Sequence, residues 1–420
     1  MYRVTRLPNG LTVATAEMPH LASVSLGLWV GVGGRFEPAE LNGASHFIEH
    51  MLFKGTRRRN AEQISQAVEG IGGYLNAFTS EENSCFYAKA TRVHFDELLD
   101  VIVDMFLNST FDPMELTKER EVIKEELASY LDQPHQLVQE LLNETLWPDH
   151  PLGRSLTGTV KTIDTLTRAE LLGFRRKNYV APATLIVAAG ACRHEKVVRA
   201  VSKFASRFPT GSNPVFEPCI PTQGKPRIRL HPRDTAQLQM AMGIRVCSRR
   251  DPRRYALRIL NAILGENMSS RLFQLLREER ALAYSVHSSL AFYDDVGSMT
   301  ISAGLDTDKL PQALRLIRHE LRRLVARAPG AAELRRARDY IIGQLDLGLE
   351  GSESQMTWVG EHYLAHGRIV TAAELKQRLR GVTAADVRGV ARDFFKPERV
   401  SLAVVSPLKS VRGLEALLSP

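Results

Sequence analysis

The order of secondary-structure signals in the second half of the chain repeats the order in the first half. In the first half, strand-like segments at 74–80 and 85–91 are followed by a helix whose apolar residues recur with helical period. In the second half, strand-like segments at 284–292 and 297–303 are again followed by such a helix. A repeat of this length indicates two related domains rather than one continuous fold.

A proline-rich segment separates the two halves. Residues 209–226 contain five prolines and show neither helical nor strand periodicity, which is typical of a linker. The chain has 420 residues, of which 44% are hydrophobic and 24% charged, and this is enough for two domains with separate cores. We therefore predict an α+β protein with two related domains, residues 1–208 and 227–420, joined by the linker 209–226. Each domain is expected to hold a mixed or antiparallel sheet flanked by helices.

The formal net charge of +8 arises from 55 Lys and Arg residues against 47 Asp and Glu residues. A basic chain can attract nucleic acid, an anionic membrane or acidic peptides. Here basic residues such as Arg315, Arg318 and Arg322 are interleaved with an apolar helical stripe, as in solvated helix faces. No nucleic-acid-binding motif accompanies them, so no nucleic-acid partner is predicted.

Other features of the composition indicate a soluble interior protein. The N-terminal residues lack the charged segment and apolar run of a secretory signal. No stretch reaches the ~18 uninterrupted apolar residues of a membrane span. The four cysteines have no C-x-x-C spacing, so neither a disulfide scaffold nor a thiolate metal site is expected. A cytoplasmic location is predicted.

The segment 43–55, GASHFIEHMLFKG, predicts a helix with one apolar and one chemically active face. His46 and His50 stand at i and i+4, a spacing that directs two imidazoles toward one tetrahedral zinc ion. Glu49 lies beside them and is free to act as a base toward water. The alternative is an amphipathic helix with two solvent-facing histidines. A third ligand elsewhere in the chain would distinguish the two interpretations.

A second helix offers a third ligand. Asp112 and Pro113 form a helix start, and the following residues keep an apolar stripe. Glu119 and Glu126 are seven positions apart, so both carboxylates lie on one face of this helix, away from that stripe. Taken alone, acidic residues at these positions are also consistent with simple solvation of the helix.

A second histidine pair is less informative. His362 and His366 also stand at i and i+4 and follow Glu361. No further ligand is evident, and Gly367 ends the helix there, so this pair is not predicted to be a functional site.

Several motifs occur in the order found in one family of zinc peptidases. The chain resembles the pitrilysin and mitochondrial processing peptidase family, the inverzincins, over nearly its whole length. The matching segments are HFIEHMLFKGT, GGYLNAFTSEE, EREVIKEEL followed by DQP, PLGRSLTG and LGENMSSRLFQLLREERALAYSV. The resemblance implies a zinc metalloendopeptidase that hydrolyses peptides, or unfolded and presequence-like segments, inside a closed chamber. The alternative is a non-catalytic structural or partner subunit of a processing-peptidase-like complex.

The resemblance also implies roles for individual residues of the first domain. His46, His50 and Glu126 would bind one Zn²⁺ per chain, and Glu49 would activate water. Glu119 would support the site. Glu125 is a rival ligand, but only Glu126 shares the helix face of Glu119.

Further implied roles concern peptide binding. The strand residues Asn76, Ala77 and Phe78 resemble the edge strand that holds substrate through main-chain hydrogen bonds. Arg277 and Tyr284 match a pair that binds substrate and stabilises the oxyanion. Four such domains form a clamshell in the family, and this chain supplies two of them. A homodimer, or a heterodimer with a sister chain, is therefore expected, with Arg277 and Tyr284 acting across the interface.

Overall fold

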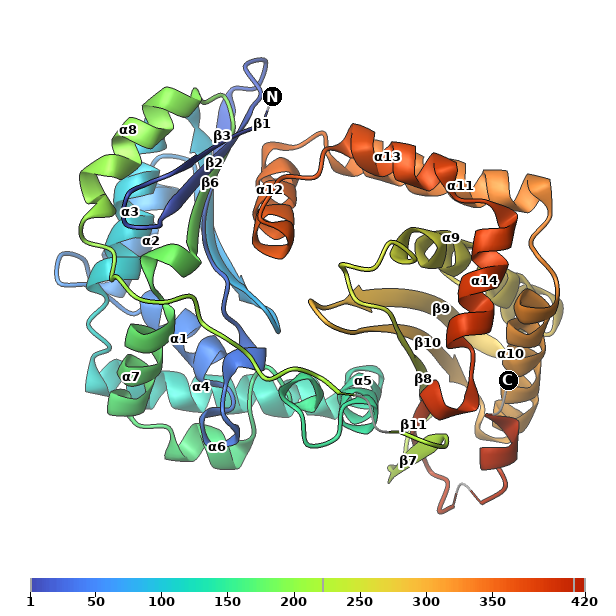
Figure 1. The fold of residues 1–420 in the computed structure, drawn as a ribbon. Coiled ribbons are helices and arrows are strands. Elements are labelled where there is room, and N and C mark those ends of the chain that lie inside the picture. Colours follow the sequence, from blue (N-terminus) through green and yellow to red (C-terminus); the bar gives the residue numbers. More distant parts are fainter. Residues whose placement is uncertain (1, 221–222, 411, 419–420) are drawn as a thin grey trace. The chain divides into compact units, whose positions relative to one another are not determined.

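The computed structural model describes residues 2–220, 223–410 and 412–418. The chain divides into two compact units, each built from three separate stretches of sequence (Figure 1). Unit 1 consists of the described residues up to Ala128, Arg154–Glu217 and Leu347–Val370. Unit 2 consists of Ser129–Gly153, the described residues of Pro218–Asp346 and those from Thr371 onward.

Unit 1 contains a six-stranded mixed sheet in the order β1-β2-β6-β3-β5-β4. Neighbouring strands are antiparallel except β2 and β6, which are parallel. Among the described strands, β4 pairs only with β5, so its other edge is open. The strands are β1 (Tyr2–Arg6), β2 (Thr12–Glu17), β3 (Ser23–Val30), β4 (Tyr74–Thr79), β5 (Ser84–Thr91) and β6 (Thr184–Gly190).

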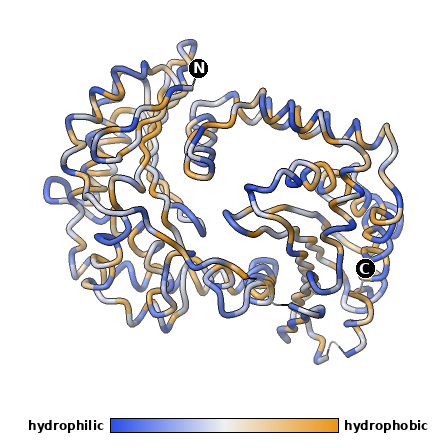
Figure 2. The backbone as a smooth tube through the Cα atoms, viewed as in Figure 1, coloured by the Kyte–Doolittle hydropathy of each residue, from blue (hydrophilic) through white to orange (hydrophobic). Residues whose placement is uncertain are grey.

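Helices cover both faces of this sheet. One face packs against helices from the first half of the chain around a large apolar core that includes Phe47, Phe86 and Phe106. The other face packs against α12, where Met356 and Val359 meet Trp29. Figure 2 shows hydrophobic positions along the central strands of this unit. The helices are α1 (Ala44–Leu52), α2 (Ala61–Glu69), α3 (Phe95–Asn108), α4 (Pro113–Asp132), α6 (Val160–Thr165), α7 (Arg168–Asn178), α8 (His194–Ala205) and α12 (Ser352–His366).

Unit 2 contains a five-stranded mixed sheet in the order β7-β11-β8-β10-β9. Its strands match β2, β6, β3, β5 and β4 of unit 1 one for one, including the parallel pair and, among the described strands, the open edge at β9. This agreement confirms the predicted α+β fold with two related sheets. The strands are β7 (Arg227–Pro232), β8 (Leu238–Val246), β9 (Ala283–Phe292), β10 (Gly297–Leu305) and β11 (Val400–Ser406).

Helices also pack against the sheet of unit 2. Val138 and Leu142 of α5 pack against Ala241 and Val405 of the sheet, while α9 and α14 contact the strands β9 and β8. The segment predicted as a helix at 271–279 is helical but has π-type hydrogen bonding over Phe273–Glu279, here η6. The helices are α5 (Pro134–Leu146), α9 (Arg254–Leu264), α10 (Leu310–Ala326), α11 (Ala331–Gly348), α13 (Ala372–Gly381) and α14 (Ala384–Phe394).

The two halves of the sequence exchange one helix each. The helix α5 belongs to the first half of the sequence but covers the sheet of unit 2. The helix α12 belongs to the second half but covers the sheet of unit 1. The chain also passes between units at Glu217 and Pro218, inside the predicted linker 209–226. The predicted domain bounds, 1–208 and 227–420, do not include this exchange. These bounds stay a prediction.

Within the described residues, no helix combines the length and the apolar character that crossing a membrane requires.

Candidate metal centre

The helix α1 places two histidines side by side on one face. Its opposite face carries Phe47, Ile48 and Met51, which are fully buried in the core of unit 1. This burial fixes the rotation of the helix, so that His46 and His50 project away from the core. Their ring centroids are 4.6 Å apart. The amphipathic pattern therefore forms the predicted helix and directs both imidazoles to one point.

A buried carboxylate holds the start of α1. Glu37 Oε2 accepts a hydrogen bond from the Gly43 N–H at 2.8 Å, and Glu37 Oε1 accepts one from the Ser45 N–H at 2.6 Å. These N–H groups lie at the start of the helix and would otherwise lack acceptors. Burial raises the pKa of Glu37, although these hydrogen bonds act in the opposite direction. Glu37 was not predicted from the sequence, because it lies well before the helix cap, outside the usual capping positions.

Gly43 lets the backbone at the start of α1 adopt a conformation that few other residues can adopt. Its φ of 95° lies in the left-handed region, which side chains other than glycine rarely adopt. A Cβ at this position would also lie 2.9 Å from the Thr157 carbonyl oxygen. Glycine at position 43 therefore lets α1 begin just before His46.

The helix α4 brings Glu126 to the two histidines. The Oε2 atom of Glu126 lies 3.8 Å from His46 Nε2 and 3.6 Å from His50 Nε2. These three residues form a group whose potential ligand atoms lie within 4.8 Å of one another. Two ligand atoms bound at about 2.1 Å to one tetrahedral ion are about 3.4 Å apart. The donor set and its spacing therefore fit a single zinc ion.

The neighbouring residue Glu125 does not join this group. Among the described residues, the potential ligands that converge here are His46, His50 and Glu126. Both glutamates are exposed on α4, so exposure does not distinguish them. The difference follows from helical phase, because adjacent residues point about 100° apart around the helix axis.

A second carboxylate of α4 orients His50. Glu119 Oε2 lies 3.0 Å from His50 Nδ1, whereas Glu126 approaches the other ring nitrogen, Nε2. The second oxygen of Glu119, Oε1, pairs with Lys54 Nζ at 2.7 Å. Glu119 is buried, so these contacts take place with little competition from water. A carboxylate at the far nitrogen of a metal-binding histidine fixes the ring and its tautomer, and Glu119 has this position here.

Burial and the mutual contacts of these residues shift their pKa values in different directions. Burial and the neighbouring His50 lower the pKa of His46 to about 4, against the opposite effect of Glu126. Burial also acts to lower the pKa of His50, but Glu126 and Glu119 together outweigh it and raise that pKa. The pKa of Glu126 is lowered, first by its contact with His50. A neutral His46 and an ionised Glu126 are the ligand forms that a metal ion requires.

Glu49 lies next to the group but is held by a different partner. Thr79 Oγ1, at the end of β4, donates a hydrogen bond to Glu49 Oε2 at 2.5 Å. Burial raises the pKa of Glu49, and the Thr79 hydrogen bond acts in the opposite direction. A carboxyl group whose pKa is raised toward working pH is well suited to take up and release a proton.

The predicted substrate strand lies on the open edge of the unit 1 sheet. Asn76, Ala77 and Phe78 belong to β4, and α1 packs against this strand. Asn76 is exposed, and its Oδ1 accepts a hydrogen bond from the Ala77 N–H at 2.8 Å. Phe78 packs edge-on against Trp29 with ring centroids 5.4 Å apart. The edge strand therefore runs toward Thr79 and the Glu49 carboxylate.

The structure also brings Arg277 and Tyr284 together, within unit 2. Arg277 lies on η6, and Tyr284 lies at the start of the edge strand β9. The Arg277 Cζ atom is 5.6 Å from the centroid of the Tyr284 ring, a cation–π distance. Tyr284 is 75% exposed, so its side chain is accessible to a ligand.

The second histidine pair does not gather ligands. His362 Nδ1 lies 2.8 Å from the Trp358 carbonyl oxygen, and the His362 and His366 ring centroids are 6.0 Å apart. Across the part of the chain that the structure describes, no group of three potential ligands includes either histidine.

Two family models match the chain. Residues 12–160 match the model described as Insulinase (Peptidase family M16), and residues 165–341 match the Peptidase M16 inactive domain. The first range contains the elements from β2 to α5, including His46 and Glu126. The second range contains Arg277 and Tyr284.

Relatives with similar sequences are named as zinc proteases. An uncharacterized zinc protease of Streptomyces coelicolor is 37% identical over 413 residues, which are 97% of this chain and 90% of the relative. The uncharacterized zinc protease YmxG of Bacillus subtilis is 36% identical over 401 residues, which are 95% of this chain and 97% of the relative.

Solved structures share the fold. A protease from Helicobacter pylori superposes with a TM-score of 0.91 at 22% identity, covering 97% of this chain and 99% of that one. A structure titled peptidase M16 inactive domain, from Pseudomonas fluorescens, gives a TM-score of 0.90 at 18% identity and covers 98% of both chains. The family models and the relatives above 30% identity show that the chain belongs to peptidase family M16, the insulinase family, and this confirms the family predicted from its motifs.

Proposed function

We propose that this chain is a zinc metallopeptidase that hydrolyses peptides or unfolded segments. The single observation that supports this most strongly is the convergence of His46, His50 and Glu126 from two helices far apart in the sequence. The names of its M16 relatives agree with a zinc-dependent protease. In this proposal one Zn²⁺ binds per chain.

Each residue of the site has a distinct role in this proposal. His46, His50 and Glu126 hold the ion, and Glu119 orients His50 through its Nδ1. When bound, zinc acts as a Lewis acid and makes water acidic enough to act as a nucleophile near neutral pH. Glu49 takes the proton from this water and later delivers it to the leaving amine. The Thr79 hydroxyl keeps the Glu49 carboxylate in place.

The substrate is proposed to bind as an added strand on β4. An extended peptide pairs with an open sheet edge mainly through its main-chain groups, so its sequence is read only loosely. The open edge of β4 ends at Thr79, the residue that holds Glu49, so a peptide on this edge has its main chain near the base. This arrangement favours unfolded or extended segments, because a folded substrate has no free main-chain groups to offer.

Arg277 and Tyr284 are proposed to contact the peptide and to stabilise the negative charge on its carbonyl oxygen. Their contact in unit 2 leaves the Tyr284 side chain exposed, as a ligand-binding pair requires. In this proposal they act in a dimer, of two copies or with a sister chain, on the metal centre of the other protomer.

Hydrolysis of a peptide library by the purified protein tests the proposed activity. We expect cleavage that stops on addition of a zinc chelator and returns when zinc is restored, because the ligand set alone cannot activate water. Mass spectrometry of the products measures the cleavage and its sequence preference. A protein that binds no zinc and cleaves no peptide would instead favour the non-catalytic partner subunit.

A mixing experiment tests catalysis across a dimer interface. Glu49→Gln and Arg277→Ala protomers are each expected to be weakly active alone. If each active centre takes its base from one protomer and its arginine from the other, one of the two centres in a mixed dimer is intact. Activity of the mixture should then exceed the sum of the two variants after subunit exchange. A monomer of full activity at working concentration, or a mixture without gain, contradicts this arrangement.

A further inference from the structure

The fold of unit 1 gathers five cationic side chains around one hollow on its surface. Lys196, Arg199 and Lys203 come from α8, Arg193 precedes that helix, and Arg92 comes from the turn before α3. We refer to this site as the basic pocket. Its volume is ≈ 750 Å³. Figure 1 shows α8 at the outer side of the helical layer of unit 1.

The basic pocket has a large surplus of positive charge. Its lining contains five Lys and Arg residues and one carboxylate, Asp96, so its formal charge is 5 − 1 = +4. The whole chain has a formal net charge of +8. All five cationic residues are exposed, and within the described residues none of them forms a side-chain ion pair with a carboxylate. No ion pair therefore offsets their mutual repulsion in the described part of unit 1.

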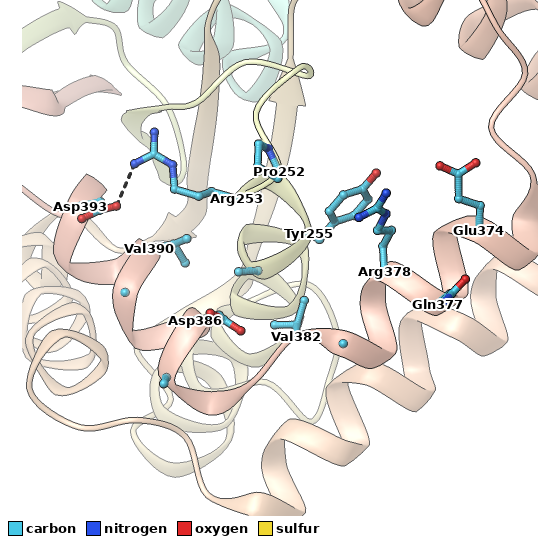
Figure 3. Close-up of a pocket in the computed structure, with 14 residues that line it drawn as sticks. Pro252, Arg253, Tyr255, Glu374, Gln377, Arg378, Val382, Asp386, Val390 and Asp393 are labelled. Atoms are coloured by element: carbon cyan, nitrogen blue, oxygen red, sulfur yellow. Dashed lines mark hydrogen bonds and ion pairs between the residues drawn. The ribbon is translucent and has the colours of Figure 1, made fainter.

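A second hollow differs from the basic pocket in the balance of its charges. A hollow of ≈ 840 Å³ in unit 2 lies between α9, α13 and α14 and is lined by both signs of charge (Figure 3). There Arg253 pairs with Asp393 at 2.8 Å and with Asp251 at 2.7 Å. Acidic residues of neighbouring segments thus balance this arginine. The lining of the basic pocket offers only Asp96 for that purpose.

The cationic side chains stand on a rigid support. His194, at the start of α8, is buried, and its two ring nitrogens lie 2.8 Å from Thr5 Oγ1 and 2.9 Å from Thr15 Oγ1. Val197 and Val201 are buried on the inner face of the same helix. The three α8 cations therefore project from a fixed helix, at i, i+3 and i+7. Along the helix axis they span about 10 Å.

Apolar side chains line the same hollow. Phe95, Val197 and Ala200 contribute to its wall, and Val93, next to Arg92, is 73% exposed. A ligand that fits this surface has several negative charges with apolar groups between them. In an extended peptide, carboxylates at alternate positions lie about 7 Å apart on one side, a spacing that the α8 cations can match.

We propose that the basic pocket binds an acidic, partly apolar segment of a polypeptide. A single-stranded nucleic acid fits less well, because its bases usually stack on exposed aromatic rings, and the one aromatic residue in the lining, Phe95, is half-buried. The proposal does not depend on the metal centre, since all the residues it uses lie on β1, β2, α3, α8 and the turns beside them. It adds a binding site for an anionic peptide to the proposed peptidase activity.

Binding of a labelled peptide tests this proposal without any need for hydrolysis. The probe is a dye-labelled peptide in which Glu alternates with Ala or Val, and its control has Gln in place of every Glu. Full-length Glu49→Gln protein is used so that the probe is not cleaved. We expect fluorescence anisotropy to show binding of the Glu peptide that weakens as salt rises toward ~0.15 M, with much weaker binding of the Gln peptide.

Charge reversal locates the binding. The triple change Lys196→Glu, Arg199→Glu and Lys203→Glu is expected to weaken binding at least ~10-fold. A version of this triple with Gln at the same three positions should also bind more weakly, at an unchanged melting temperature. Its loss of affinity then comes from the missing positive charges rather than from a damaged fold.

A matched control changes the net charge equally at a distance from the basic pocket. Arg315→Glu, Arg322→Glu and Arg335→Glu lie at exposed helix positions of unit 2 and should leave the affinity within about twofold. Equal loss in both reversal variants, equal binding of the Gln peptide, or tighter binding of single-stranded DNA would overturn the proposal.

Discussion

The Glu49→Gln variant is expected to lose peptidase activity by about 10²–10⁴-fold while retaining its fold and its metal. Glutamine has nearly the same shape as glutamate, and its amide oxygen still accepts the hydrogen bond from Thr79. It cannot take a proton from water at neutral pH, so the loss should appear in kcat. Steady-state kinetics on a defined peptide, with zinc content measured by mass spectrometry, gives both quantities.

A matched variant separates this effect from a general effect of charge. Glu69→Gln removes one negative charge from an exposed position of α2, in the same unit but outside the metal centre. Its activity should equal that of the unaltered protein. Full activity of Glu49→Gln with normal zinc content would exclude Glu49 as the base.

The Glu126→Gln variant is expected to bind zinc more weakly by more than about 100-fold and to lose activity in parallel. It removes the carboxylate that lies 3.8 Å and 3.6 Å from the two histidine Nε2 atoms. A neutral amide is a poorer ligand, and the two imidazoles alone do not complete a zinc site. Competition with a chromogenic chelator measures the affinity directly.

Glu125→Gln is the control for this prediction, because Glu125 has the same charge and lies next to Glu126 on α4. It is exposed and does not belong to the group of converging ligands, so its substitution should leave zinc affinity and activity unchanged. Equal losses in the two variants would show that the third ligand is misassigned. Loss of zinc in Glu125→Gln but not in Glu126→Gln would show that Glu125, and not Glu126, is the third ligand.

Local sequence signals were sufficient to predict the two helices of the candidate site. Asp112 and Pro113 mark the start of α4, which begins at Pro113 in the structure. The seven-residue spacing of Glu119 and Glu126 then places both carboxylates toward α1. These predictions succeed because they depend on helical period and on capping, which neighbouring residues determine.

Contacts between distant segments could not be predicted in the same way. The apolar stripe of α5 indicates that one face of this helix is buried, but the stripe does not specify which of the two sheets that face packs against. The basic pocket is similar, because Arg92 and Lys196 are remote in sequence and meet only once α3 and α8 pack together. Glu37 was missed for a related reason, since its acceptor role depends on how the loop before Gly43 folds back.

Because of the exchange of α5 and α12, neither half of the sequence contains all the helices that cover its own sheet. A gene cut within codons 209–226 would yield two products, each missing the helix that shields one side of its sheet. Each product would expose apolar strands to water and would tend to aggregate or to recombine with the other. Proteolysis that removes one half of the chain likewise removes the helix that covers the sheet of the remaining half. Each half of the chain therefore depends on the other half to bury its sheet.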